Sequence, residues 1–250
     1  MRAPGWLTAR PVAHRGLHDY ARGIVENMPG AVRSAVAANF SIEIDIQLTV
    51  DGEAMVHHDD ELGRLTEGSG ALRTKTADEL KRVTFKNTSE KMMSLAELCA
   101  LVAGRVPLVI EVKSHFDGDR RLVRRMADVL SAYNGPAVGM SFDPDQVLAL
   151  RDLIPSRPRG ILAERHYTET DWPEATPYQR AAMTNLRAAF RARPHFVAYL
   201  VDELPAVAPW IARNIFQCPL LTWTVRTPEQ RARAAKYADQ MIFEGFHPNL

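Results

Sequence analysis

Short apolar or β-branched segments alternate with helical patterns along most of this chain, and this alternation is the feature that most restricts its fold. Strands separated by helices pair in parallel, and eight such βα units close a (β/α)8 barrel, the TIM barrel. We therefore expect an α/β TIM barrel, as a single domain over residues 1–250. The predicted strands are residues 11–14, 41–47, 107–113, 137–142, 160–164, 196–201, 220–225 and 240–245.

One further segment, residues 53–58, has strand character but follows the second strand too closely for a parallel crossover. The dipeptide Asp51-Gly52 is a strong signal for a two-residue turn, so this segment should add an antiparallel hairpin strand after the second strand. With Asp51-Gly52 at the centre of the turn, Asp45 lies opposite His58, and opposed residues share a face. A slip of one residue would place His57 there, so His57 is the alternative to the preferred His58.

Composition excludes several classes of function. The 31 basic residues are balanced by 30 acidic residues, which gives no indication of nucleic-acid binding. The arginine-rich segments 119–130 and 187–196 are interpreted as solvated helix faces. We find no membrane span and no signal peptide. Because Cys99 and Cys218 lack CxxC spacing, we expect buried, reduced thiols and a cytoplasmic protein.

Carboxylates gather where predicted strands end, and in a (β/α)8 barrel this rim is where active sites are built. Glu43 and Asp45 share one face of the second strand, and Glu111 lies in the third. Three carboxylates in a small space repel one another unless they share protons or bind a cation. Oxygen ligands suit Mg²⁺, Ca²⁺ or Mn²⁺, so we favour a metal site. The alternative is that each carboxylate pairs with a base such as Arg15 or Lys113.

The segment AHRG, residues 13–16, supplies a different chemistry at the end of the first predicted strand. Arg15 offers a fork of donors that matches phosphate oxygens, and Gly16 would let the backbone approach a ligand. His14 and His58 could act as an acid/base pair across a cleft. The sequence contexts of the histidines outside 13–16 and 57–58 support no particular role.

These segments closely resemble the glycerophosphodiester phosphodiesterase family. The resemblance is carried, in order along the chain, by AHRG (13–16), VENMPGAVRSAVAANFSIEIDIQLTVDGEAMVHHDDELGRLTEGSG (25–70), PLVIEVK (107–113) and LLTWTV (220–225). It is most specific between residues 13 and 113. It implies a TIM barrel that uses one divalent cation to hydrolyse a small-molecule glycerophosphodiester to an alcohol and sn-glycerol 3-phosphate.

The resemblance also implies a role for each matching residue. It implies metal ligation by Glu43, Asp45 and Glu111, and acid/base catalysis by His14 and His58. It implies substrate binding by Arg15 and Lys113 at the phosphate, by Asn27 of the Glu26-Asn27 pair near the first strand, and by Trp223 as an apolar wall for the glycerol.

Three positions depart from the usual family pattern. Met28 replaces a common Thr or Ser, Arg226 replaces a frequent Asn, and Phe243-Glu244 belongs to MIFEGFHP in place of Thr-Asp-Arg-Pro. Because these positions lie near the predicted rim, the head group of the substrate stays open. A lysophospholipase D-like lipid phosphodiesterase is one alternative; it would need an apolar entrance, which the loop at residues 165–177 with Tyr167 and Trp172 leaves open. A non-catalytic phosphodiester-binding protein is another, and the sequence does not give the oligomeric state.

Overall fold

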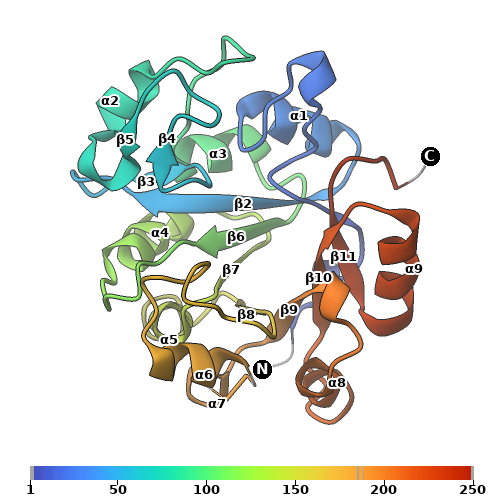
Figure 1. Cartoon of the computed structure of the whole chain (residues 1–250). Coiled ribbons are helices and arrows are strands. Elements are labelled where there is room, and N and C mark those ends of the chain that lie inside the picture. Colours follow the sequence, from blue (N-terminus) through green and yellow to red (C-terminus); the bar gives the residue numbers. More distant parts are fainter. Residues whose placement is uncertain (1–2, 185, 188, 249–250) are drawn as a thin grey trace. The chain divides into compact units, whose positions relative to one another are not determined.

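A computed structural model describes residues 3–184, 186–187 and 189–248 of the chain (Figure 1). Contacts divide the chain into two compact units, each built from separate segments. The unit formed by Ala13–Lys113 and Arg120–Ala137 is called the N-terminal unit. The unit formed by Met1–Val12, Ser114–Asp119 and Val138–Leu250 is called the C-terminal unit. The single domain expected over residues 1–250 stays a prediction.

The sheet of the N-terminal unit has a long central strand, β2 (Ser41–Leu48), with β6 (Leu108–Val112) parallel on one side and β3 (Ala54–Val56) antiparallel on the other (Figure 1). β2 and β6 are buried on both faces, which is the environment of strands in a parallel sheet covered by helices. The other elements are η2 (Tyr20–Arg22), α1 (Pro29–Ala37), β4 (Glu61–Leu62), β5 (Gly70–Ala71), η3 (Leu72–Thr74), α2 (Ala77–Arg82), α3 (Leu95–Val102) and α4 (Arg121–Ser131).

Helices α2 and α3 begin at N-cap residues that form capping boxes. Thr76 and Ser94 are N-caps whose side chains accept hydrogen bonds from the backbone N–H of Glu79 and Glu97, and each glutamate bonds back to its N-cap. These capping boxes satisfy amide groups that a helix start otherwise leaves unpaired. Local sequence is therefore sufficient to set both helix starts.

The C-terminal unit contains four parallel strands in sequence order, from β8 (Arg159–Ala163) through β9 (Phe196–Leu200) and β10 (Leu220–Val225) to β11 (Gln240–Phe243). β7 (Ala137–Ser141) pairs in parallel with β8. The loop predicted over residues 165–177 has no helix or strand up to residue 176, and α6 begins at Pro177. The prediction that both thiols are buried is right for Cys99 but wrong for Cys218, which is only half-buried. The remaining elements are η1 (Gly5–Leu7), α5 (Pro144–Leu153), α6 (Pro177–Thr184), α7 (Ala189–Ala192), η4 (Val201–Glu203), α8 (Val207–Asn214) and α9 (Pro228–Tyr237).

The strand-then-helix order confirms the predicted (β/α)8 fold class. With β1 (Val12–Ala13), the described residues contain a strand within each of the eight predicted segments. The additional hairpin strand is also present as β3. None of the helices within the described ranges combines the length and hydropathy that a membrane crossing needs.

The predicted register of the β2–β3 hairpin is wrong by one residue. Ile46 pairs with Val56, and Gln47 with Met55, so Asp45 lies opposite His57 rather than His58. The connection has three residues, 50–52, because the N–H of Thr49 donates to the carbonyl of Glu53. Gly52 has φ +85°, as expected for the left-handed residue that ends a three-residue hairpin loop.

Candidate active site

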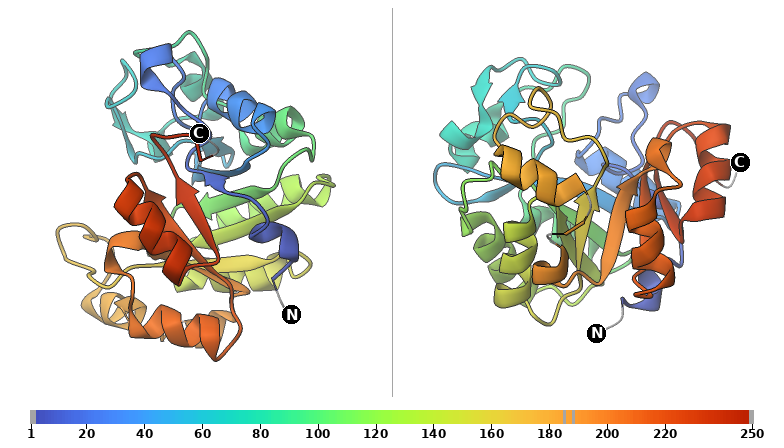
Figure 2. Two further views of the ribbon diagram at one scale, coloured as in Figure 1. Left: turned by 90° about the vertical axis from the view of Figure 1, so that its right-hand side faces the viewer. Right: turned by 60° about the horizontal axis from the view of Figure 1, so that its bottom comes forward.

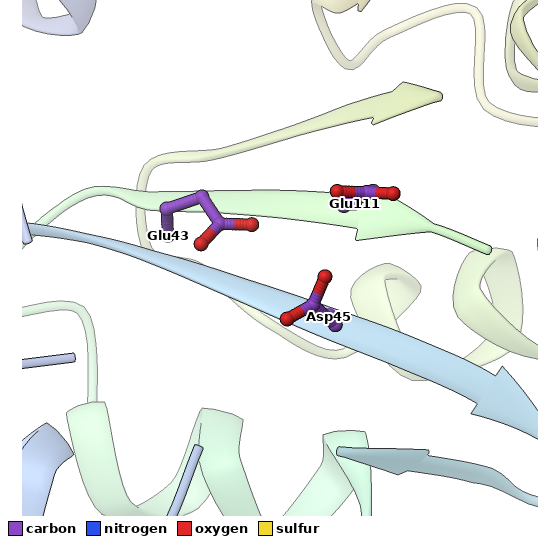
Figure 3. Close-up of side chains that lie close together, drawn as sticks. All are labelled: Glu43, Asp45 and Glu111. Atoms are coloured by element: carbon purple, nitrogen blue, oxygen red, sulfur yellow. The ribbon is translucent and has the colours of Figure 1, made fainter. Parts of the chain in front are cut away.

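Three carboxylates from two neighbouring strands converge in the N-terminal unit (Figure 3). Asp45 in β2 lies directly beside Glu111 in β6, and Glu43 precedes Asp45 by two residues on the same face of β2. Each residue offers a carboxylate oxygen, and these oxygens all lie within 4.8 Å of one another. All three residues are buried, so the parallel register of β2 and β6 builds a compact acidic cluster in the protein interior.

Two cations and an amide contact this cluster. The Nζ atom of Lys113 lies 2.9 Å from both Asp45 Oδ1 and Glu111 Oε1. The Nδ2 group of Asn27 donates to Asp45 Oδ2 at 2.9 Å. Arg15 Nε lies 3.5 Å from Asp45 Oδ2 and forms no hydrogen bond with any described residue, although it is buried. This guanidinium therefore has a donor available to an anionic ligand.

The pKa values of the three carboxyl groups are shifted in different directions, because burial and mutual repulsion raise them and neighbouring cations lower them. Burial, then the charges of Asp45 and Glu111, hold the pKa of Glu43 well above its usual value. Burial also raises the pKa of Glu111, which Lys113 partly offsets. For Asp45 burial is outweighed by Lys113, His58 and Arg15, so its pKa is well below its usual value. Full ionisation of the cluster would therefore place more negative charge here than its neighbours neutralise.

The backbone around Arg15 brings the AHRG segment to the cluster. Arg15 adopts φ +54°, and its N–H donates to Glu43 Oε2 at 3.0 Å. The N–H of Asn27 donates to the carbonyl of Arg15 at 2.8 Å. His14 Nε2 lies 3.9 Å from Glu43 Oε2. The structure thus brings together His14, Arg15 and Asn27, which the sequence assigned to one site.

Gly16 lies close to a helix, and the expectation that it lets the backbone approach a ligand stays a prediction. A Cβ atom on Gly16 would lie 2.9 Å from the backbone carbon of Ala31 in α1, and Gly16 has φ +80°. Both the backbone conformation and the contact exclude a larger residue here. Gly16 therefore allows the segment after β1 to pack against α1.

The two adjacent histidines follow β3, which ends at Val56, and their surroundings differ. His57 is buried, and its ring meets Phe85 edge-on at a centroid distance of 6.1 Å. His58 is partly exposed and is among the groups that lower the pKa of both Asp45 and Glu111. Gln47 Nε2 donates to the carbonyls of residues 57, 58 and 59 and so holds this segment in place.

A series of interacting charged side chains next to the site was not predicted from the sequence. Asp59 Oδ1 lies 2.9 Å from His58 Nδ1, and Arg64 Nε donates to Asp59 Oδ2 at 2.7 Å. Arg64 also donates to Glu26, whose Oε1 accepts from Arg15 at 2.7 Å. These contacts thereby link the side chains of His58 and Arg15. The only signal in the sequence was the run of charges after β3.

The residues of the site fit a divalent cation by charge and by ligand type. Five carboxylates (Glu26, Glu43, Asp45, Asp59 and Glu111) are connected by these contacts to three permanent cations (Arg15, Arg64 and Lys113). If all eight groups were ionised, two negative charges would remain, and one divalent cation would balance them. Buried oxygen ligands of this kind suit Mg²⁺, Ca²⁺ or Mn²⁺.

Comparison with known proteins decides the family. Residues 14–246 match the model of the "Glycerophosphoryl diester phosphodiesterase family". The chain belongs to this family. A Bacillus subtilis (strain 168) protein, YhdW, which carries a provisional name as a glycerophosphodiester phosphodiesterase, is 28% identical over 96% of this chain and 99% of its own. The prediction of a phosphodiesterase enzyme is confirmed at this level.

Solved structures show the same fold in phosphodiesterases of the family. A phosphodiesterase of Oleispira antarctica, in complex with the product sn-glycerol-3-phosphate, has a TM-score of 0.75 at 17% identity, covering 93% of this chain and 91% of its own. The glycerophosphodiester phosphodiesterase of Thermotoga maritima has a TM-score of 0.69 at 22% identity, covering 94% of each chain.

The departures from the family pattern have local explanations in this phosphodiesterase. Met28 is buried in a core cluster with Met55 and Met92, so it fills space where a hydroxyl would cap α1. Arg226 Nε lies 2.7 Å from Glu244 Oε1. Two of the unusual positions are therefore partners of each other, 18 residues apart.

Trp223 belongs to the C-terminal unit of the enzyme, and its predicted role at the glycerol stays a prediction. Its ring meets Phe142 edge-on at a centroid distance of 5.4 Å. Phe142 in turn packs against Trp172, which contacts Tyr167 of the same loop. The loop aromatics thus form one cluster with Trp223.

Proposed function

We propose that this enzyme hydrolyses glycerophosphodiesters to an alcohol and sn-glycerol 3-phosphate, and that it requires one divalent cation. The observation that carries the proposal is the convergence of Glu43, Asp45 and Glu111 within 4.8 Å beside Arg15 and Lys113. The product bound by the Oleispira antarctica relative supports the choice of substrate class.

The three carboxylates would hold Mg²⁺, Ca²⁺ or Mn²⁺, which supplies Lewis-acid stabilisation of charge on the phosphoryl oxygens when it is bound. Arg15 and Lys113 would bind the phosphate, because fixed positive charge is most effective where the transition state gathers negative charge. The unpaired Nε–H of Arg15 is a suitable donor to a phosphate oxygen. Asn27 would keep Asp45 oriented through its hydrogen bond.

His14 and His58 would transfer the protons. One imidazole removes a proton from the nucleophile, and the other gives a proton to the departing alkoxide oxygen. Asp59 binds Nδ1 of His58 and leaves its Nε2 for this transfer. The nucleophile is either water or the neighbouring glycerol hydroxyl. The hydroxyl route would form a cyclic phosphate, which a rapid quench would detect.

The test is hydrolysis of glycerophosphocholine by the full chain, with sn-glycerol 3-phosphate as the measured product. Activity should disappear in EDTA and return with Mg²⁺, Ca²⁺ or Mn²⁺, and the order of recovery identifies the preferred ion. Glu111→Gln should require more cation for half-maximal recovery, whereas the exposed Glu67→Gln should behave as wild type. Full activity in EDTA would contradict the proposed cation dependence.

A lysophospholipase D-like activity is the second candidate, because Tyr167, Trp172 and Phe142 pack into an aromatic cluster in the C-terminal unit. Lysophosphatidylcholine should then be cleaved faster than glycerophosphocholine. A non-catalytic phosphodiester-binding protein is less favoured because every proposed catalytic and ligand residue is present. The proposed cytoplasmic location is supported by the free thiols of Cys99 and Cys218.

A further inference from the structure

Helix α8 and the turn that follows it expose large apolar side chains in the C-terminal unit. Val207, Ile211 and Ile215 recur every four residues and form one stripe, with Trp210 and Phe216 beside it. Their exposed fractions lie between 37% and 75%, and we call these five residues the α8 patch. Contiguous exposed patches of large apolar residues mark interaction surfaces, unlike single exposed residues.

An adjacent side of α8 packs against the protein. Ala208 and Ala212 pack against a core cluster that includes Val197 and Tyr199, and Pro209 is buried. The helix is therefore apolar both towards the protein and towards solvent. Its inward face stabilises the fold, so the α8 patch is not needed to hold the helix in place.

A groove adjoins the patch and carries positive charge. It has a volume of about 730 Å³, and its lining includes Val207, Ile211, Phe216, Arg187 and Arg193. Both arginines are exposed, and neither forms an ion pair within the described residues. Among the residues that the structure describes, none of those lining the groove is acidic. Figure 2 (right) shows α8 in the C-terminal unit.

Nearby carboxylates are neutralised by other residues. Asp202, which precedes α8, lies 3.2 Å from Arg233, and Asp239 lies 2.9 Å from Arg213 of α8 itself. The unpaired charge beside the α8 patch is therefore positive. An apolar surface flanked by unpaired arginines is complementary to a partner that offers both acyl chains and negative charge.

We propose that the α8 patch docks this enzyme on the surface of an anionic phospholipid bilayer. Val207, Trp210, Ile211, Ile215 and Phe216 would enter the boundary between head groups and acyl chains, and Arg187 and Arg193 would contact lipid phosphates. A second copy of the chain fits less well, because a symmetric contact through this surface would need acidic groups that the groove lining lacks. This docking does not depend on the proposed hydrolysis.

The test is flotation of the full chain with vesicles of phosphatidylcholine containing about 30% phosphatidylglycerol, compared with pure phosphatidylcholine vesicles. We expect the wild type to float with the anionic vesicles and to lose most binding on pure phosphatidylcholine or at high salt. Trp210→Gln with Phe216→Gln should weaken binding by about tenfold or more through lost apolar insertion. Arg187→Gln with Arg193→Gln should remove the preference for anionic lipid.

Val50→Gln is the matched control, because Val50 is a similarly exposed apolar residue on the β2–β3 turn. It should bind vesicles as wild type does. All variants should hydrolyse glycerophosphocholine at the wild-type rate, which separates docking from catalysis. The proposal is overturned if wild type ignores anionic vesicles, or if the Trp210/Phe216 variant binds them unchanged. It is also overturned if sedimentation shows a dimer that this variant converts to monomer, since the patch would then be a self-association surface.

Discussion

The Nδ1 atom of His58 lies 2.9 Å from the Asp59 carboxylate, and Arg64 holds the other oxygen of that carboxylate at 2.7 Å. A carboxylate on one ring nitrogen selects the tautomer and stabilises the imidazolium that forms when the other nitrogen takes a proton. We therefore expect Asp59 to position His58 for its proposed role in proton transfer.

Asp59→Asn should lower kcat by about a hundredfold with little change in KM, because the amide keeps the shape but not the charge. Steady-state kinetics on glycerophosphocholine over a range of pH checks this. Asp59→Glu should recover part of the loss. The exposed neighbour Asp60 provides the control, and Asp60→Asn should be silent. Equal losses at both positions would remove the positioning role.

The adjacent histidines should separate into a catalytic and a structural residue. His58→Ala and His14→Ala should abolish turnover while calorimetry still detects cation binding. His57→Ala should keep most of kcat but destabilise the fold by about 2–3 kcal/mol, since it removes a buried ring packed on Phe85. Denaturant unfolding measures the second effect. Inactive but fully stable His57→Ala would reverse the assignment.

Glu43→Gln should stabilise the protein in EDTA and weaken its response to a cation. Burial, together with the charges of Asp45 and Glu111, raises the pKa of Glu43 in the folded protein. The free energy of unfolding therefore falls as pH rises from the ordinary pKa of this group to its raised value, because ionising the buried carboxyl group destabilises the fold. Glutamine removes that cost at neutral pH. A cation at a hundred times its Kd adds about 2.7 kcal/mol to a protein that binds it, and this gain should shrink in the variant. Thermal unfolding with and without cation tests both effects, with Glu67→Gln as the control.

Glu26 should contribute to the acid stability of the fold. Burial opposes its ionisation, but Arg64, Arg15 and Tyr20 outweigh burial and lower its pKa to about 2. A lowered folded pKa gives stability that is present above the ordinary value and is lost as pH falls towards 2. Glu26→Gln should therefore cost on the order of 2 kcal/mol at pH 7 and much less near pH 2. Urea unfolding at several pH values measures the difference, and a pH-independent cost would contradict it.

Local chemistry in the sequence was sufficient for much of this molecule. Alternation along β2 assigns Glu43 and Asp45 to one face, since side chains two residues apart in a strand point the same way. Thr76 and Ser94 mark helix starts by forming capping boxes with residues three positions later. Both inferences need only neighbouring residues and standard backbone geometry.

Long-range contacts required the folded chain. The register between β2 and β6 sets Glu111 beside Asp45, and no local pattern specifies how two strands about sixty residues apart align. The hairpin register was predicted wrongly from the local turn signal. Hydrogen bonds from Gln47 hold the segment after β3, in which His57 is buried and His58 is partly exposed. Arg226 pairs with Glu244 for the same reason: packing brings together side chains that are remote in sequence. Residue types and strand periodicity thus follow from covalent neighbours, whereas the contacts that turn these groups into a site arise from packing between distant segments.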